Sequence, residues 1–143
     1  MSKSWLSGLL RARKAQEDFA AQQLAAAQRR AQRAAARVHY DRDRLETLKL
    51  ADASYAAPAF VAAAVALQAA AATHAAAVAV AEHAVVDTQE RRGELGDAAR
   101  ARRSVEELHD RQLAEAEAHA RRAAQAELDE IAARISRDAR SQP

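Results

Sequence analysis

The sequence predicts an all-α fold, a long antiparallel two-helix coiled-coil hairpin with an overhanging C-terminal helix. The composition favours helix throughout, because 143 residues include only 3 glycines, 2 prolines and 3% aromatic residues, while alanine, arginine, glutamate, leucine and glutamine dominate. A single interior proline, Pro58, marks a turn. Apolar residues recur at heptad spacing on both sides of this proline, which is the pattern of a coiled coil.

The first helix is predicted over residues 3–52. Three polar side chains, Arg13, Glu17 and Asp41, interrupt its apolar heptads. The predicted contact seam comprises Leu10, Leu24, Ala31, Val38 and Leu45 in one heptad position and Leu6, Ala20, Ala27, Ala34 and Leu48 in the other.

A turn is predicted over residues 53–58. Proline pushes the residue before it away from helical geometry, and Asp52, Ser54 and Tyr55 precede Pro58. Proline is tolerated in the first turn of a helix, where its missing N–H would have had no partner. Pro58 therefore suits the first turn of the second helix.

The second helix is predicted over residues 59–138. Gly93 and Gly96 are poor helix formers and make a kink near residues 93–96 plausible, either as a hinge or as a tolerated feature. The predicted seam alternates by four and three and consists of Phe60, Ala64, Leu67, Ala71, His74, Val78, Ala81, Val85, Thr88, Arg92, Leu95 and Ala99.

Folding the chain about residue 56 pairs positions whose numbers sum to 112. This axis brings the two stripes together as the pairs Leu45–Leu67, Leu48–Ala64, Ala34–Val78, Ala31–Ala81 and Ala27–Val85. Residues from about Gln112 onward then have no intramolecular partner. Ala124, Leu128, Ile131 and Ile135 form an apolar stripe in this tail, which predicts a docking surface or, alternatively, the interface of a homodimer.

Charge is distributed unevenly along the chain. Residues 1–50 hold 11 Lys and Arg against 5 Asp and Glu, whereas residues 53–81 hold no charged residue. The uncharged stretch is long enough to span a bilayer, but alanine contributes less to insertion than leucine, isoleucine, phenylalanine or valine, so we favour a helix outside the membrane. The apolar run from Trp5 to Leu10 is too short for a signal peptide.

No catalytic or metal-binding pattern is evident. The chain has no cysteine, no HExxH motif and no phosphate-binding glycine-rich loop. His74 lies on the predicted seam, where a lone histidine is more often a tolerated or register-setting residue than a ligand. We therefore expect a non-enzymatic protein without cofactor or metal.

Three short segments resemble the FliJ family of flagellar export components. The N-terminal segment over residues 5–13, with its aromatic residue, leucine pair and spaced arginines, is similar to the start of this family. The basic run and Val105-Glu106-Glu107-Leu108 resemble the family's Leu-Glu-x-Leu element, and residues 126–132 resemble its closing Asp-Glu pattern. The Gln-Lys-like pair that usually precedes this Asp-Glu is absent.

The resemblance implies a coiled-coil stalk of the flagellar type III export apparatus, cytoplasmic and peripheral to the inner membrane. It implies binding to the hexameric export ATPase, to the membrane export gate and to export chaperones, without nucleic acid. The implied partner-binding residues are Leu9, Leu10, Arg11, Arg13, Val105, Glu106, Leu108, Arg111, Glu127, Leu128, Asp129, Glu130, Ile131 and Ile135.

Two other functions fit the sequence. The basic N-terminal half could bind nucleic acid or an anionic membrane surface, in which case binding would depend strongly on salt. The coiled coil could also be a purely structural homo-oligomer, whose mass would depend on concentration.

Overall fold

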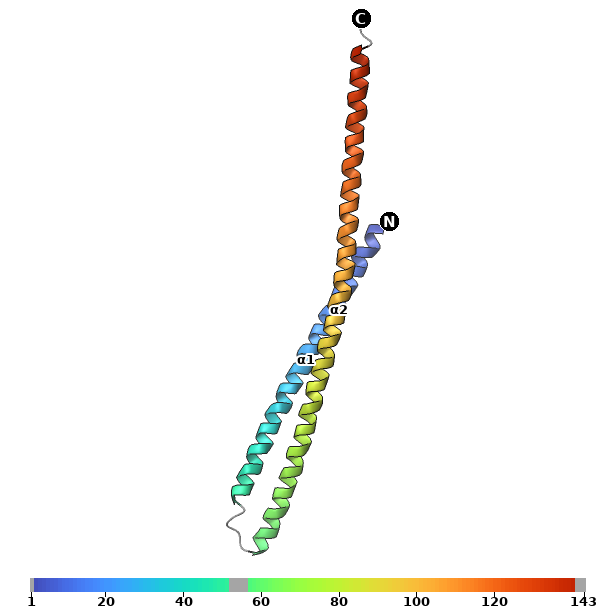
Figure 1. Ribbon diagram of the computed structural model, residues 1–143. Helices are drawn as coiled ribbons and strands as arrows, with labels where there is room; N and C mark the ends of the chain where they lie inside the picture. Colours follow the sequence, from blue (N-terminus) through green and yellow to red (C-terminus); the bar gives the residue numbers. More distant parts are fainter. Residues whose placement is uncertain (1, 52–56, 141–143) are drawn as a thin grey trace. The chain divides into compact units, whose positions relative to one another are not determined.

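The computed structural model describes residues 2–51 and 57–140, and all of them are helical. Helix α1 spans Ser2–Ala51 and helix α2 spans Ala57–Arg140. The two helices pack against each other in an antiparallel hairpin, which confirms the predicted all-α hairpin (Figure 1). Residues 53–56 of the predicted turn lie outside the described residues, and Ala57 and Pro58 already belong to α2. Pro58 lies in the first turn of α2, where its missing N–H has no intrahelical carbonyl to bond.

The two helices contribute to two compact units. Lys14–Ala99 forms one unit, called here the hairpin unit, and Met1–Arg13 with Arg100–Pro143 forms the other, called the terminal unit. Helix α2 continues through Gly93 and Gly96, and no described glycine has a positive φ. Both glycines therefore keep helical backbone geometry.

The seam of α1 lies where the heptads predict it. Ala20 and Ala27 are buried, and the other predicted apolar positions, from Leu6 to Leu48, are at least half-buried. Arg13, Glu17 and Asp41 also lie on the seam, and Asp41 retains only 2% of its exposure. The heptad period of α1 thus holds even where polar residues occupy it.

The seam of α2 differs from the prediction at several positions. Leu67, His74 and Ala81 are partly buried as predicted, but Ala70 and Ala77 are the buried alanines, whereas Ala71 is exposed. The sequence placed Phe60, Ala64, Ala71, Val78, Val85 and Arg92 on the seam, and of these only Val78 loses much exposure. Alanines at steps of three and of four fit a seam equally well, so the sequence alone did not distinguish Ala70 from Ala71.

The pairing register is also shifted from the predicted sum of 112. Arg30 of α1 pairs with Asp87 of α2, and these numbers sum to 117. Ala34 lines a groove with Val80, a sum of 114, instead of lying opposite Val78. The two observed seams align when paired numbers sum to about 115. Alanine faces carry no large side chain that excludes neighbouring registers, so the sequence pattern left this offset open.

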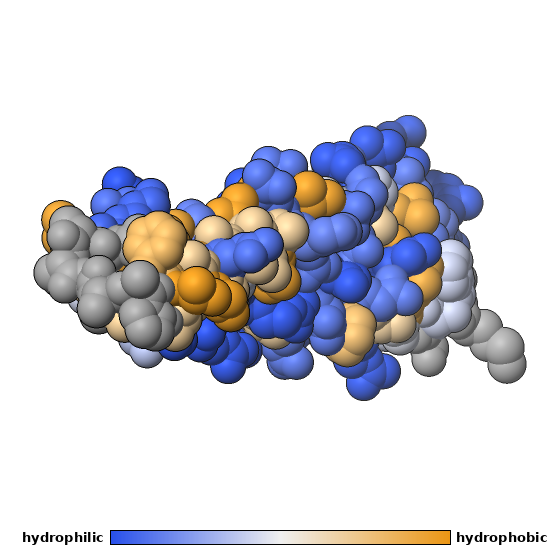
Figure 2. All heavy atoms as spheres, turned by 90° about the horizontal axis from the view of Figure 1, so that it is seen from below, coloured by the Kyte–Doolittle hydropathy of each residue, from blue (hydrophilic) through white to orange (hydrophobic). Residues whose placement is uncertain are grey.

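The core of the hairpin unit is thin. Its buried apolar residues among the described positions are Ala20, Ala27, Ala70 and Ala77, all small. Burial contributes about 25 cal/mol per Å² of apolar area, so each alanine adds little. Larger apolar side chains remain outside, and Leu50 is 82% exposed. Seen from below, hydrophobic residues gather at the end where α1 stops and α2 begins (Figure 2).

One stretch of α2 is long and apolar enough, by length and composition, to cross a membrane. It is the alanine-rich stretch that the sequence already singled out. Ala70 and Ala77 within it are buried against α1, so the structure places part of this stretch in a helix–helix contact. Only 6% of the 18-residue window that meets this test is buried, so most of this stretch lies exposed on the hairpin unit.

Candidate partner-binding surfaces

The terminal unit contains all the residues that the family resemblance implies in partner binding. Its N-terminal part packs Leu6, which is fully buried, against the part of α2 that follows Arg100. Val105, His109 and Gln112 lose exposure at steps of four and three, which is the spacing of a helix seam. The two segments of the terminal unit pack against each other at this short seam.

Beyond Ala118 every described residue of α2 is exposed. This segment, residues 119–140, has no second helix beside it within the terminal unit (Figure 1). The predicted uncovered tail began at about Gln112, and the structure confirms an overhang that is complete from His119. A helix of 22 residues is about 33 Å long at 1.5 Å per residue.

An apolar stripe, called here the C-terminal stripe, runs along this overhang. It consists of Ala124, Leu128, Ile131 and Ile135, and the last three are 61%, 53% and 65% exposed. Leu113, which is 40% exposed, and Ala120 extend the same face by a helical repeat and were missed by the sequence reading. Their seven-residue spacing was the available signal.

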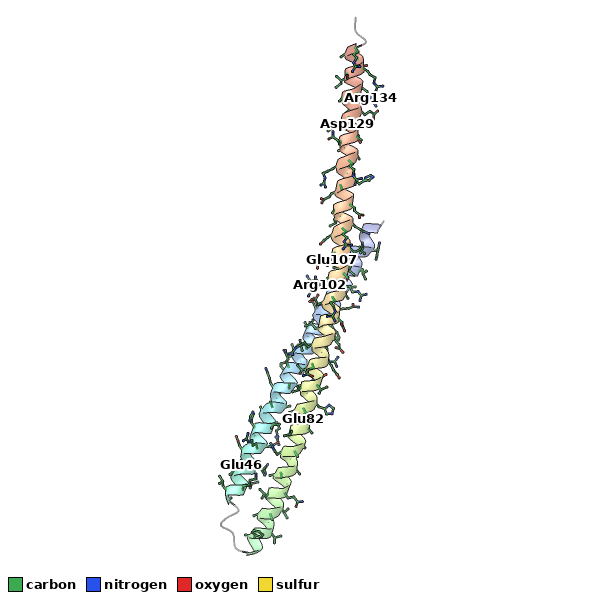
Figure 3. All side chains as sticks on the ribbon, in the orientation of Figure 1. Glu46, Glu82, Arg102, Glu107, Asp129 and Arg134 are labelled. Carbon is green, nitrogen blue, oxygen red and sulfur yellow. The ribbon has the colours of Figure 1, made fainter. Side chains whose placement is uncertain are left out.

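Several charged residues of the overhang have partners on the same helix. Arg134 pairs with Glu130, Arg121 with Glu117, and Gln125 donates a hydrogen bond to Asp129 at 2.8 Å. The side chains labelled Asp129 and Arg134 project from the unaccompanied part of the helix (Figure 3). Exposed i,i+4 pairs contribute only about 0.3–0.5 kcal/mol each, so they are easily rearranged by a partner.

Except for Glu127 on the overhang, the remaining implied residues lie nearer the short seam. Leu9, Leu10, Arg13, Val105 and Glu106 are half-buried there, and Glu106 pairs with Arg102. The other members are more exposed: Arg11, Glu127, Leu108 at 44%, and Arg111, which lies 4.0 Å from Glu107. The implied partner-binding residues thus fall into two groups: some are partly buried by the chain itself, and the others are exposed.

Asp41 and His74 form the polar part of the hairpin seam. Asp41 accepts a hydrogen bond from Arg37 at 2.8 Å through one carboxylate oxygen, while the other oxygen is buried without a partner. The Nδ1 atom of His74 is also buried without a partner. No group of three His, Cys, Asp or Glu among the described residues could hold a metal ion.

Comparison with known proteins decides what kind of chain this is. The family model described as flagellar FliJ protein matches residues 2–141. The chain belongs to the FliJ family. No curated protein and no solved structure matches it. The FliJ match covers both units, and it makes this protein a component of flagellar protein export.

Proposed function

We propose that this FliJ-family chain is a non-enzymatic stalk that docks on the hexameric export ATPase through its C-terminal stripe. The observation that carries this proposal is the exposure of Leu128, Ile131 and Ile135 on a helix that no other described segment covers. Exposed apolar side chains at helical spacing favour a partner that removes them from water.

The geometry of the overhang suits entry into a ring. A single helix is about 10–12 Å wide with its side chains, which is narrower than a helix pair. Glu127, Asp129 and Glu130 lie beside the stripe and supply acceptors for basic groups of the ATPase. The apolar stripe would provide affinity and the flanking carboxylates would fix its orientation.

The same proposal extends to the export gate and the export chaperones. Arg11 is exposed on the N-terminal segment of the same unit, so a basic surface accompanies the apolar stripe. Such a surface attracts acidic partners. We place the protein in the cytoplasm, peripheral to the inner membrane, where it would link the ATPase to the gate.

The test is the double substitution Leu128→Asp and Ile131→Asp. Both side chains are exposed, so helicity by circular dichroism should be unchanged, whereas two carboxylates would be desolvated in the interface. Co-purification with the export ATPase should fall at least about a hundredfold, since losing two central apolar contacts costs about 3 kcal/mol or more.

A matched control places the same charges on other exposed apolar residues. Leu50→Asp with Val61→Asp alters side chains that are 82% and 64% exposed in the hairpin unit. This control should retain ATPase binding. Retained binding by the Leu128 and Ile131 variant would contradict the proposal, and a concentration-dependent mass that this variant abolishes would assign the stripe to a homodimer instead.

A further inference from the structure

The hairpin unit carries a groove between α1 and α2 that has walls of different chemistry. Ala34 and Val80 line two adjoining hollows of this groove. A third hollow lies nearer the turn, between Leu48 and Ala66. From Arg30 to Leu48 the groove extends about 27 Å at 1.5 Å per residue, enough for five turns of another helix.

The α1 wall carries a row of arginines, called here the arginine stripe. Arg30, Arg33, Arg37 and Arg44 follow one another with Tyr40 at steps of three and four, so they share one edge of the helix. Arg37 lies 5.3 Å from the Tyr40 ring centre, which orders part of this edge.

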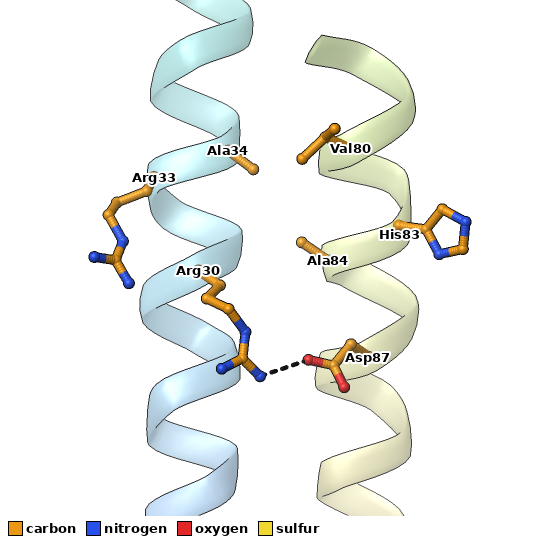
Figure 4. Close-up of a pocket in the computed structure, with 7 residues that line it drawn as sticks. All are labelled: Arg30, Arg33, Ala34, Val80, His83, Ala84 and Asp87. Carbon is orange, nitrogen blue, oxygen red and sulfur yellow. Dashed lines mark hydrogen bonds and ion pairs between the residues drawn. The ribbon is translucent and has the colours of Figure 1, made fainter. Parts of the chain in front are cut away.

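Part of the arginine stripe is unused by the chain itself. Arg30 donates a hydrogen bond to Asp87 at 2.8 Å across the groove (Figure 4). Arg37 pairs with Asp41. Arg33 and Arg44 are exposed and make no ion pair with any described residue. Two guanidinium groups therefore remain available to an acidic partner.

Between Ala59 and Val80 the α2 wall is uncharged and largely apolar, and beyond Val80 it carries His83 and Asp87. Ala62, Ala66, Thr73, Ala76 and Val80 line the hollows at helical spacing, and all are exposed. Residues 59–81 of α2 contain no charged side chain, whereas residues 29–50 of α1 hold 7 Lys and Arg against 3 Asp and Glu. The groove is thus basic along one rim and apolar along the other.

We propose that this groove binds an amphipathic helix of another protein, with an apolar face and an acidic edge. The apolar face would cover the alanines and Val80, and the acidic edge would meet Arg33 and Arg44. A nucleic acid or an anionic bilayer could satisfy the arginines, but phosphates would gain nothing from the apolar wall. The hollows are lined by no Phe, Tyr or Trp for base stacking, and the ring of Tyr40 in the arginine stripe is already in contact with Arg37.

The test uses a synthetic helical peptide of 21 residues as the probe. It carries leucine and alanine along one face, glutamate along one edge and glutamine elsewhere, and a matched peptide carries lysine in place of glutamate. The full chain should bind the glutamate peptide at least about tenfold more tightly than the lysine peptide in fluorescence anisotropy, because rim charges select between like and opposite partners.

Charge reversal on the protein sharpens this test. Arg33→Glu with Arg44→Glu should weaken glutamate-peptide binding at least about tenfold and strengthen lysine-peptide binding. Arg42→Glu is the matched control, because Arg42 is equally exposed but does not belong to the arginine stripe. Ala76→Glu tests the apolar wall and should also abolish binding while helicity is retained.

Several outcomes would overturn the inference. An equal loss with Arg42→Glu would show non-specific attraction, and failure of the glutamate peptide to bind would remove the docking site. Tight binding of duplex DNA or phosphatidylglycerol vesicles, lost in the Arg33 and Arg44 variant, would assign the groove to phosphate groups. The groove lies in the hairpin unit, so these results are independent of ATPase docking by the terminal unit.

Discussion

The hairpin unit and the terminal unit bury apolar residues of different size and to different extents. The hairpin unit buries small side chains, Ala27 and Ala70 among them, in a continuous helix–helix seam. The terminal unit buries Leu6 in a short seam and leaves the larger Leu128 and Ile131 exposed. The hairpin unit is thus held together largely by weakly hydrophobic residues, whereas the overhang of the terminal unit leaves strongly hydrophobic ones exposed.

The largest effect is expected from a charge placed in the hairpin seam. Ala70→Glu would bury an unpaired carboxylate at a position that is 8% exposed, and should lower the free energy of unfolding by about 3 kcal/mol. Ala71→Glu, one residue along on the exposed side, should change it by less than about 0.5 kcal/mol. Urea denaturation followed by circular dichroism measures both.

The same pair of variants decides between the two seams for α2. The sequence placed Ala71 in the contact, whereas the structure places Ala70 there. The opposite result, with Ala71→Glu the more damaging variant, would support the α2 seam that the sequence predicted. It would also contradict the contrast drawn between the two units, because a different set of residues would then hold the hairpin unit together.

A smaller effect of the opposite sign is expected at Asp41. This residue is 2% exposed and one of its oxygens has no partner, so the carboxylate is desolvated without full compensation. Asp41→Leu should raise the free energy of unfolding by about 1–2 kcal/mol, as replacement of buried ionic groups by apolar ones often does. Asp43→Leu, at an exposed position nearby, should give no such gain.

Asp41 also bears on the uniqueness of the hairpin register. A polar residue in an apolar seam fixes register at some cost in stability. Cysteines introduced at Arg30 and Asp87 should be joined readily by a short bifunctional thiol reagent in the native background, since an arginine and an aspartate side chain together span the gap between these positions. A slower or mixed crosslinking pattern in the Asp41→Leu background would show that Asp41 selects the register.

The smallest effect is expected from acid titration of Asp87. The hydrogen bond from Arg30, aided by the charges of Arg30 and Arg91, lowers the pKa of this carboxyl below its ordinary value of 3.8. A depressed folded-state pKa gives stability that is present above pH 3.8 and is lost as the pH falls through the lowered value. Asp87→Asn should therefore flatten the acid limb of the stability curve.

The terminal unit supplies the control for this titration. Glu130 pairs with Arg134 along one helix, and both side chains are more than half exposed. Glu130→Gln should leave the acid limb of the wild-type curve unchanged, because no cross-helix contact is lost. An equal effect from the two substitutions would show that the Arg30–Asp87 bond does not hold the helices together.

Sequence by itself determined the helices, the hairpin, the overhang and the family. These predictions rest on local properties: helix propensity, one interior proline and the heptads of α1. Such properties can be recognised without knowing which segments contact each other. The exposed Leu128, Ile131 and Ile135 followed because the chain held nothing to cover them. Leu113 and Ala120 share that local signal and could have been found the same way.

Tertiary structure alone decided which alanines of α2 meet α1, the register of the hairpin, and the groove beside it. Small side chains pack at several offsets, so the choice between Ala70 and Ala71 depends on contacts between the helices. The arginine stripe was visible as basic charge, but only the helix packing placed it opposite an apolar wall. Local sequence patterns specify the helices, whereas the register in which two alanine-rich helix faces pack is decided by contacts in the folded chain.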